Sequence, residues 1–237
     1  MQEKLFHFKQ FSISQNNSAL KICTDSVLLG AYTDKNDCAT VLDIGTGTGV
    51  LALMIAQKTN AKITAIDIDN GAIIDAQKNF NNSPWKDRLE LFEMSIQDFN
   101  LYNSYYDLIV CNPPYFQNSL LSPKASKSIA KHNISLSIEE LFGAVSRLLS
   151  PHGQFNMIIP FDLESTVIST SRLFNLHLEK QVFIKPTNNK PANRIIFQFS
   201  LLKKNFYSVE TIVIEPQIRH QYSERYNQLL KEYLLKL

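Results

Sequence analysis

The chain has 237 residues, a hydrophobic fraction of 44% and a formal net charge of +2. Its length and apolar content favour one large α/β domain, and its near-neutral charge neither requires nor excludes a nucleic-acid partner. No apolar stretch suggests a bilayer span or a signal peptide, and the three cysteines lack the spacing of metal ligands. We therefore expect a soluble, cytoplasmic protein that holds no metal and is not bound to a membrane.

The N-terminal segment predicts a β-hairpin followed by a helix. Apolar residues alternate imperfectly through 5–13, and the polar stretch 15–18 predicts a turn into a partner strand over 19–23. Thr24 or Asp25 can cap the helix that follows. Capping is the default role for Asp25, and contact with a bound ligand is the alternative.

A glycine-rich turn follows, between an apolar strand and an apolar helix. The strand contains Asp43, and the turn contains Gly45, Gly47 and Gly49. Glycine permits a sharp reversal of the chain and lets a ligand approach the backbone closely. The spacing Gly-x-Gly-x-Gly departs from the dinucleotide fingerprint Gly-x-Gly-x-x-Gly, so a dinucleotide is the poorer interpretation.

The next two strands lead to acidic residues. The strand 62–67 ends in Asp67, about 20 residues after the glycine turn, which is the distance expected for a carboxylate that binds a ribose. Asp69 is expected to cap the helix 70–80. A strand over 89–94 is followed by Asp98, which could accept a hydrogen bond from an adenine amine or could belong to an ordinary turn.

The stretch Tyr-Asp-Leu-Ile-Val-Cys-Asn-Pro-Pro-Tyr-Phe, residues 106–116, carries the strongest chemical signal. Its apolar part predicts a buried strand, which ends at Asn112 because proline cannot donate a ladder hydrogen bond. The side-chain oxygen of Asn112 and the carbonyl oxygen of Pro113 could accept the two N–H bonds of a planar amine. Tyr115 could stack on the flat group. The alternative is a tight turn without a chemical role.

The glycine turn, Asp67, Asp98 and the Asn-Pro-Pro-Tyr motif each follow a predicted strand. We therefore expect them at the carboxyl edge of one sheet, where open α/β folds bind ligands. Directly after the amine motif, residues 116–134 form a polar stretch that contains Lys124, Lys127, Lys131 and His132. A loop of this length is either functional or simply solvated. We consider its three lysines candidates for binding RNA phosphates. His132 is as compatible with a structural role as with a catalytic one.

The remainder predicts further helices and the end of the sheet. Ser137 and Glu140 form a capping-box signature for a helix over 137–150. Lys190 and Arg194 belong to a basic loop that could contact RNA and that joins two final strands in a hairpin. The elements expected beyond 150 are a strand over 154–160, a helix over 163–174, strands over 177–185 and 194–202, a possible extra strand over 209–215, and a helix over 222–237.

Together, the glycine turn, Asp67 and Asn-Pro-Pro-Tyr resemble the class I S-adenosylmethionine-dependent methyltransferases that modify planar nitrogen. The flanking stretches narrow the resemblance. Phe-Lys-Gln-Phe-Ser-Ile from Phe8, Lys-Ile-Cys-Thr-Asp-Ser-Val-Leu-Leu-Gly-Ala-Tyr from Lys21, and the loop from Lys185 to Arg194 are similar to the bacterial tRNA(Val) adenine-37 N6-methyltransferase family.

This resemblance implies a Rossmann-like α/β fold. We expect a central, mostly parallel sheet of seven strands with a terminal antiparallel hairpin, helices on both faces, and a small N-terminal β-hairpin plus helix. We expect a single methyltransferase domain over 1–237, in which 1–37 form the N-terminal hairpin and helix, 38–203 the catalytic core and 204–237 a C-terminal extension.

The resemblance also implies S-adenosyl-L-methionine as cofactor and a tRNA as partner of a monomeric enzyme. It assigns Asn112 and Pro113 to the target amine and Tyr115 to the target base. Direct in-line transfer to adenine N6 would need neither a metal nor a covalent enzyme intermediate. The cofactor-binding residues would be Asp43, Gly45, Gly47, Gly49, Asp67 and Asp98.

Three alternatives remain at this point. Release-factor glutamine N5-methyltransferases also resemble the chain at Asn-Pro-Pro-Tyr, because a side-chain amide presents the same two N–H bonds. The N-terminal segment here is too short for the helical domain that such enzymes carry. Adenine methylation in another RNA or in DNA is the second alternative. A non-catalytic RNA-binding protein is the third, but it would predict loss of the glycine turn or of Asn112, and the sequence retains both.

Overall fold

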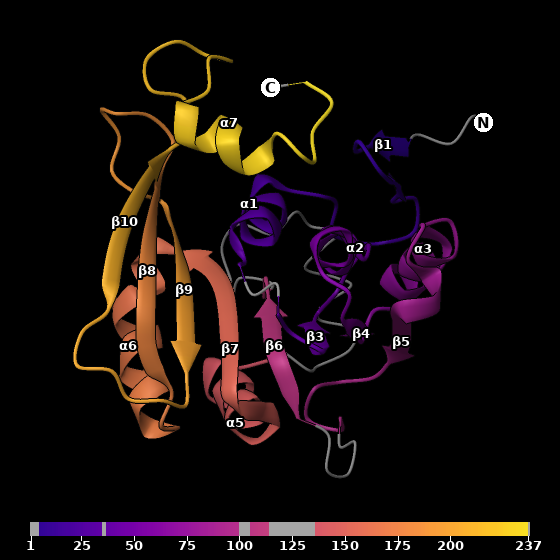
Figure 1. Ribbon diagram of the computed structural model, residues 1–237, viewed down its shortest axis with the longest axis horizontal. Coiled ribbons are helices and arrows are strands. Elements are labelled where there is room, and N and C mark those ends of the chain that lie inside the picture. Colours follow the sequence, from indigo (N-terminus) through magenta and orange to yellow (C-terminus); the bar gives the residue numbers. More distant parts are fainter. Residues whose placement is uncertain (1–4, 35–36, 100–104, 114–135, 237) are drawn as a thin grey trace.

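The computed structural model describes residues 5–34, 37–99, 105–113 and 136–236. In this part of the chain, an eight-stranded sheet runs through the molecule with helices on both faces (Figure 1). The strand order is β10-β8-β9-β7-β6-β3-β4-β5. The strands are β3 (Thr40–Ile44), β4 (Lys62–Asp67), β5 (Leu89–Glu93), β6 (Tyr106–Cys111), β7 (Leu149–Pro160), β8 (His177–Lys185), β9 (Arg194–Ser200) and β10 (Ser208–Val213).

The mostly parallel sheet that the sequence predicts is confirmed. Strands β5, β4, β3, β6 and β7 are parallel, and β9 runs antiparallel to both β7 and β8. The sheet has eight strands rather than seven because the possible strand near 209–215 forms β10, which pairs in parallel with β8. The antiparallel hairpin is therefore followed by one further strand at the edge of the sheet.

Two hydrophobic clusters cover the two faces of the sheet. Neighbouring strand residues belong to different clusters, as Val41 and Leu42 do, because side chains alternate across a strand. Both faces of the parallel strands are buried in this way, which explains their continuous apolar runs. Helices α1 (Thr24–Tyr32), α2 (Val50–Lys58), α3 (Asn70–Asn81) and α7 (Glu224–Leu230) contribute to one cluster, and α5 (Ile138–Leu148) and α6 (Glu164–Leu173) to the other.

The helix caps expected from the sequence are present where their side chains reach the first turn. The side chain of Asp69 accepts a hydrogen bond from the backbone N–H of Ala72 at 3.1 Å. Ser137 and Glu140 form the capping box of α5. For α1, both suggested caps are wrong, because Cys23 is the N-cap residue and its side chain makes no capping hydrogen bond.

The order of the strands explains where the site lies. From β3 the chain proceeds outward through β4 and β5, and then returns to the other side of β3 as β6. Ligands in open α/β folds bind at such a point, where adjacent strands connect in opposite directions across the sheet. The glycine turn follows β3 and Asn112 follows β6, so the topology brings these two sequence motifs together.

The N-terminal hairpin lies at a different place from the one predicted. Strand β1 (Leu5–His7) pairs with β2 (Ser12–Ser14). The single strand expected over 5–13 therefore contains all of β1 and the first two residues of β2. A turn closes the hairpin, with a hydrogen bond from the Phe8 N–H to the Phe11 carbonyl oxygen. The expected strand over 19–23 is wrong. Asp75 instead accepts hydrogen bonds from the backbone N–H groups of residues 17 and 18, and this fixes an irregular path.

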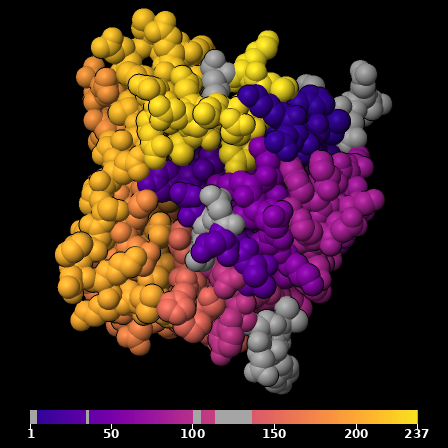
Figure 2. All heavy atoms as spheres, in the orientation of Figure 1, coloured from indigo at the N-terminus to yellow at the C-terminus, as the bar shows by residue number. Residues whose placement is uncertain are grey.

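The C-terminal helix is shorter than predicted, because α7 ends at Leu230 and the chain then turns. Tyr233 lies in this turned segment, and its hydroxyl donates a hydrogen bond to the Met54 carbonyl oxygen of α2. Its own carbonyl oxygen accepts a hydrogen bond from Lys9 of the N-terminal segment. Figure 2 shows the C-terminal segment (yellow) beside the N-terminal segment (indigo) on the molecular surface. Among the helices of the described residues, none is long and apolar enough to cross a membrane.

Candidate active site

A cavity of about 620 Å³ opens at the carboxyl edge of the sheet, a size suited to a small ligand. Five parts of the chain meet there. They are the segment that leads into α1, the glycine turn with the start of α2, the residues that follow β6, the end of β7, and the start of β9. The residues that line the cavity are 20–23 and 26, 45–48, 50 and 51, 112 and 113, 160–162, and 193 and 194.

The glycine turn presents bare backbone to this cavity. Gly45 and Gly47 have φ angles of +69° and +57°, in the left-handed region that favours glycine, and no atom lies within 4 Å of a Cβ built on either. Gly49 has a φ of +80°, and a Cβ there would lie 2.5 Å from the ring of Phe80. The first two glycines therefore leave room for a ligand, whereas Gly49 is required by the packing of α2 on α3.

Asp43 supports the turn from inside the protein. Its Oδ2 accepts hydrogen bonds from the Thr46 hydroxyl at 2.7 Å and the Ala52 N–H at 3.1 Å. Its Oδ1 is buried and has no hydrogen-bond partner among the described residues. Burial raises the pKa of Asp43 to about 7, although its two hydrogen bonds favour the charged form. Asp43 is not among the residues that line the cavity, so its contacts act on the shape of the turn.

Asp67, at the end of β4, is bonded to the same turn. Its Oδ2 accepts a hydrogen bond from the Gly47 N–H at 2.7 Å, and its Oδ1 accepts one from the Asp69 N–H at 2.9 Å. Burial raises the pKa of this carboxyl group, while the two backbone donors oppose that shift. Asp98 is exposed and accepts a hydrogen bond from the Ser95 hydroxyl at 2.6 Å. Neither Asp67 nor Asp98 lines the cavity.

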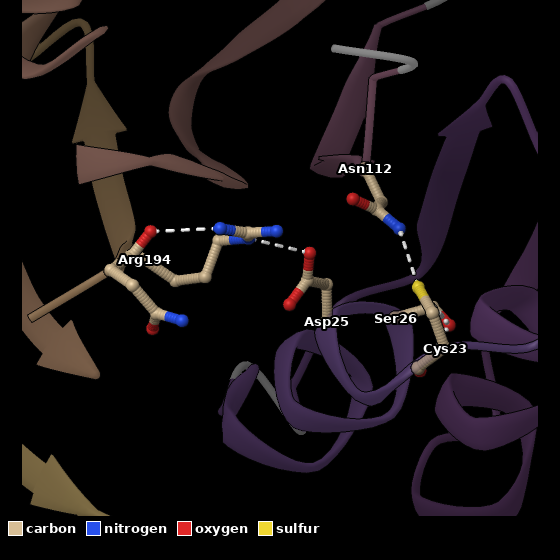
Figure 3. Close-up of polar contacts among 6 residues, drawn as sticks. Cys23, Asp25, Ser26, Asn112 and Arg194 are labelled. Atoms are coloured by element: carbon tan, nitrogen blue, oxygen red, sulfur yellow. Dashed lines mark hydrogen bonds and ion pairs between the residues drawn. The ribbon is translucent and has the colours of Figure 1, made fainter. Parts of the chain in front are cut away.

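Asn112 leaves β6 directly beside the cavity, and Pro113 is buried next to it. The Nδ2 of Asn112 donates a hydrogen bond to the Sγ of Cys23, with 3.7 Å between the two atoms. Figure 3 shows the amide nitrogen directed at Cys23 and the amide oxygen directed away from it, toward the side on which Asp25 and Arg194 lie. The amide oxygen therefore does not face the cysteine.

An ion pair connects the start of α1 to the start of β9 at the edge of the cavity. The Nε of Arg194 lies 2.8 Å from Oδ2 of Asp25 (Figure 3), and a second guanidinium nitrogen donates to the Asn193 carbonyl oxygen at 2.9 Å. Arg194, expected on a basic loop that could contact RNA, is also part of the cavity wall. Lys190, from the same loop, is exposed and does not line the cavity.

Several predicted residues fall outside the described part of the chain. They are Tyr115, Lys124, Lys127, Lys131 and His132, together with the rest of 114–135. Their suggested roles stay predictions. Within the described residues, no group of three or more histidine, cysteine, aspartate or glutamate side chains could hold a metal ion.

Comparisons with known proteins agree with this arrangement of fold and cavity. Residues 17–175 match the family model of the methyltransferase small domain. The chain is 39% identical to a tRNA1(Val) (adenine(37)-N6)-methyltransferase from Bacteroides fragilis (strain YCH46), with 100% of both sequences covered. It is 40% identical to the protein of the same name from Phocaeicola vulgatus, again with 100% of both covered.

The chain belongs to the tRNA1(Val) (adenine(37)-N6)-methyltransferase family. Its fold is that of a Rossmann-like methyltransferase. A predicted O-methyltransferase from Agrobacterium tumefaciens is similar with a TM-score of 0.72 at 15% identity, covering 88% of this chain and 96% of that one. At this identity, the likeness concerns the fold alone.

S-adenosylmethionine is the cofactor of this methyltransferase, and the residues at the cavity fit it. The open space beside Gly45 and Gly47 lets a ligand lie against the backbone, as the glycine turn predicts. Asp67 does not line the cavity itself, and its Oδ2 is bonded to the Gly47 N–H of the turn that does. The cavity reaches from this turn to Asn112 and can hold a donor and an acceptor together.

Part of the cavity wall consists of residues that no sequence motif indicated. Pro160, Phe161 and Asp162 lie at the end of β7, and the rule that ligands bind beyond the carboxyl ends of parallel strands would have pointed to them. Cys23 gave no such signal. Its place beside Asn112 depends on how α1 packs against the sheet, which no local pattern encodes.

Proposed function

We propose that this methyltransferase transfers a methyl group from S-adenosylmethionine to the exocyclic N6 of adenine 37 in the anticodon loop of tRNA(Val). Relatives named tRNA1(Val) (adenine(37)-N6)-methyltransferase match the chain over its full length. The observation that carries the proposal is structural: Asn112 and the glycine turn border one cavity. A planar amine held at Asn112 would therefore lie in the same space as a donor held at the turn.

The proposed donor side consists of the glycine turn and the carboxylates around it. The backbone of Gly45 and Gly47 lies against the donor, and Asp67 accepts hydrogen bonds from its ribose hydroxyls. Asp43 acts through the turn, because its described hydrogen bonds go to Thr46 and Ala52. Asp98 is assigned to the donor adenine from the sequence, although it does not line the cavity.

The proposed acceptor side consists of Asn112 and Pro113. S-adenosylmethionine supplies an activated methyl group when it is bound. The Oδ1 of Asn112 and the carbonyl oxygen of Pro113 accept the two N–H bonds of the adenine amine, so that its lone pair turns out of the ring plane. Tyr115 is assigned to stacking on the base. An adenine in a single-stranded loop can enter such a site at low cost.

We also propose that the enzyme acts as a cytoplasmic monomer and that basic residues near the cavity bind the tRNA. The candidates are Lys124, Lys127, Lys131, Lys190 and Arg194. Phosphate contacts of this kind would position the RNA, whereas the adenine in the cavity is recognised through its amine.

Methyl transfer from labelled S-adenosylmethionine tests this function. We expect incorporation into tRNA(Val), none into the same tRNA with guanine at position 37, and none into a release factor. Incorporation into release factor alone would overturn the proposal in favour of a glutamine N5-methyltransferase. Incorporation into the position-37 variant would show that another nucleotide is the target.

The Asn112→Ala variant tests the amine clamp. Because it removes one of the two acceptors, we expect turnover to fall by about 100-fold or more, while the dissociation constant for S-adenosylmethionine stays within about twofold. Asn60→Ala is the matched control, since Asn60 is exposed at the opposite edge of the sheet. Wild-type turnover by the Asn112 variant would end the clamp proposal.

A further inference from the structure

Two loops lie side by side at the edge of the sheet where the cavity opens. One joins β8 to β9 (186–193) and the other joins β10 to α7 (214–223). They are connected by hydrogen bonds from the Glu215 N–H to the Pro186 carbonyl oxygen at 3.0 Å and from the Asn188 N–H to the Pro216 carbonyl oxygen at 3.3 Å. Because β8 and β10 are parallel, both loops leave the sheet at the same edge (Figure 1).

The first loop continues directly into the cavity wall. Asn193 and Arg194 line the cavity, and the Asn193 carbonyl oxygen accepts a hydrogen bond from the Phe161 N–H at 3.1 Å. The pair between Arg194 and Asp25 fixes the guanidinium at this rim. A ligand that leaves the cavity across this rim would therefore pass onto the two loops.

The two loops and their ends carry more positive than negative charge. We call the set Lys185, Lys190, Arg194 and Arg219 the loop track. Lys190 and Arg219 are exposed, and Lys185 is half-buried with its Nζ bonded to the Asn188 carbonyl oxygen. The carboxylates that face the track are Glu215, which accepts a hydrogen bond from the His220 N–H, and Asp25, which is paired with Arg194. Asp162 lines the neighbouring wall.

The loop track lies outside the part of the chain that is shared with other methyltransferases. The match to the methyltransferase small domain covers residues 17–175, so the track lies wholly outside it. The tRNA-modifying relatives, in contrast, match the whole chain. Residues that distinguish this family from other methyltransferases are expected to serve the choice of substrate.

We propose that the loop track binds the phosphate backbone of the anticodon arm next to the nucleotide in the cavity. This inference rests on the proposed function. A nucleotide that enters the cavity remains joined to its strand, which must cross the rim as a continuous row of negative charges. Cations on two mutually bonded loops beside the rim complement such a row better than they complement a neutral protein segment.

The double variant Lys190→Ala/Arg219→Ala tests the track without touching the cavity. We expect the KM for tRNA(Val) to rise roughly fivefold to tenfold, with kcat and the affinity for S-adenosylmethionine unchanged. The slope of log(kcat/KM) against log[salt] should become shallower by about 1.5, because two phosphate contacts are lost. The matched control is Lys86→Ala/Lys203→Ala, which removes two exposed lysines from the opposite edge of the sheet.

Direct binding of a fluorescent anticodon stem–loop RNA separates this proposal from the proposed function. If the track variant binds this RNA more weakly than the control does, the result supports RNA binding by the loop track. This holds even if the wild-type protein transfers no methyl group to tRNA, because that result would overturn only the proposed methyltransferase function. Equal RNA binding and equal salt slopes in the track variant and the control would overturn the proposal that the loop track binds RNA. A track variant that loses affinity for a release factor but not for RNA would also overturn it.

Discussion

The side-chain amide of Asn112 has two ends of similar shape and opposite hydrogen-bonding character. Only one orientation presents an acceptor to an incoming amine. The Sγ of Cys23 lies 3.7 Å from the Nδ2 of Asn112 and accepts its hydrogen bond, which leaves Oδ1 directed away from the cysteine (Figure 3). At the scale of single residues, Cys23 is therefore suited to keeping the proposed clamp in its working orientation.

We predict that Cys23→Ala lowers kcat by about twofold to threefold, because the hydrogen bond that positions Asn112, weak since sulfur is a poor acceptor, is lost. The KM for tRNA and the affinity for S-adenosylmethionine should not change. Cys23→Ser should retain most of the activity, since a hydroxyl oxygen also accepts a hydrogen bond. Steady-state kinetics of both variants provide the measurement. Equal kcat values for the alanine and serine variants would contradict the positioning role.

The sequence predicted Asn112 but not Cys23, and the difference has a physical cause. Asn112 stands between a buried strand and two prolines, so local rules place it at the end of the strand. The same rules predicted the glycine turn. Cys23 lies beside Asn112 because of how α1 packs against the rest of the fold. Arg194 and Asp25, which are 169 residues apart in the sequence, come together in the same way. Contacts between residues so far apart in the sequence leave no periodic pattern in it.

At the scale of elements, α1 and α2 are joined by a half-buried lysine. The Nζ of Lys58, near the end of α2, donates hydrogen bonds to the carbonyl oxygens of Gly30, Ala31 and Thr33 at the end of α1. These carbonyl groups would otherwise lack partners within their helix. Burial lowers the pKa of Lys58 to about 8. This contact holds the helix that carries Cys23 and Asp25 toward the cavity.

We predict that Lys58→Met lowers the free energy of unfolding by about 2 kcal/mol at pH 7, because it leaves carbonyl groups without their donor. The pKa of Lys58 is lower in the folded chain than its ordinary value of 10.5. The unfolded chain therefore binds more protons between about pH 8 and pH 10.5, and the stability of the wild type should rise relative to the variant over this range. Urea denaturation at several pH values measures both effects. Lys203→Met, on an exposed lysine, is the control.

Most elements of the sheet were predictable because apolar periodicity and turn residues mark them directly. The bounds of β8 agree with the sequence-based expectation residue for residue. The errors occur where side chains from elsewhere decide the path. Asp75 holds the chain near Ser18 out of a strand, and the turned segment containing Tyr233 packs on α2 instead of continuing the last helix.

At the scale of the molecule, both ends of the chain pack on the same face of the sheet. Phe8, Leu230 and Tyr233 belong to one hydrophobic cluster together with residues of α1 and α2. Phe8 also forms a β-bridge with Leu234. This shared core supports the proposal that 1–237 form a single domain, since a separate extension would bury its apolar residues on its own.

We predict that Leu230→Ala destabilises the whole protein by about 2–5 kcal/mol, because it opens a cavity at a fully buried position. Unfolding should remain a single transition. Trp85, the one tryptophan of the chain, packs at 5.8 Å from the ring of Phe11 and reports on the N-terminal segment. Its fluorescence and the far-ultraviolet circular dichroism should therefore change at the same denaturant concentration.

Leu235→Ala is the matched control for this experiment, because Leu235 has the same side chain, lies five residues away and is 61% exposed. It should shift the free energy of unfolding by less than about 0.5 kcal/mol. If Leu230→Ala instead produced two separate transitions, with the tryptophan signal unchanged in the first, the C-terminal segment would unfold as an independent unit. The single core that joins both ends of the chain to the catalytic sheet would then be the wrong description of this protein.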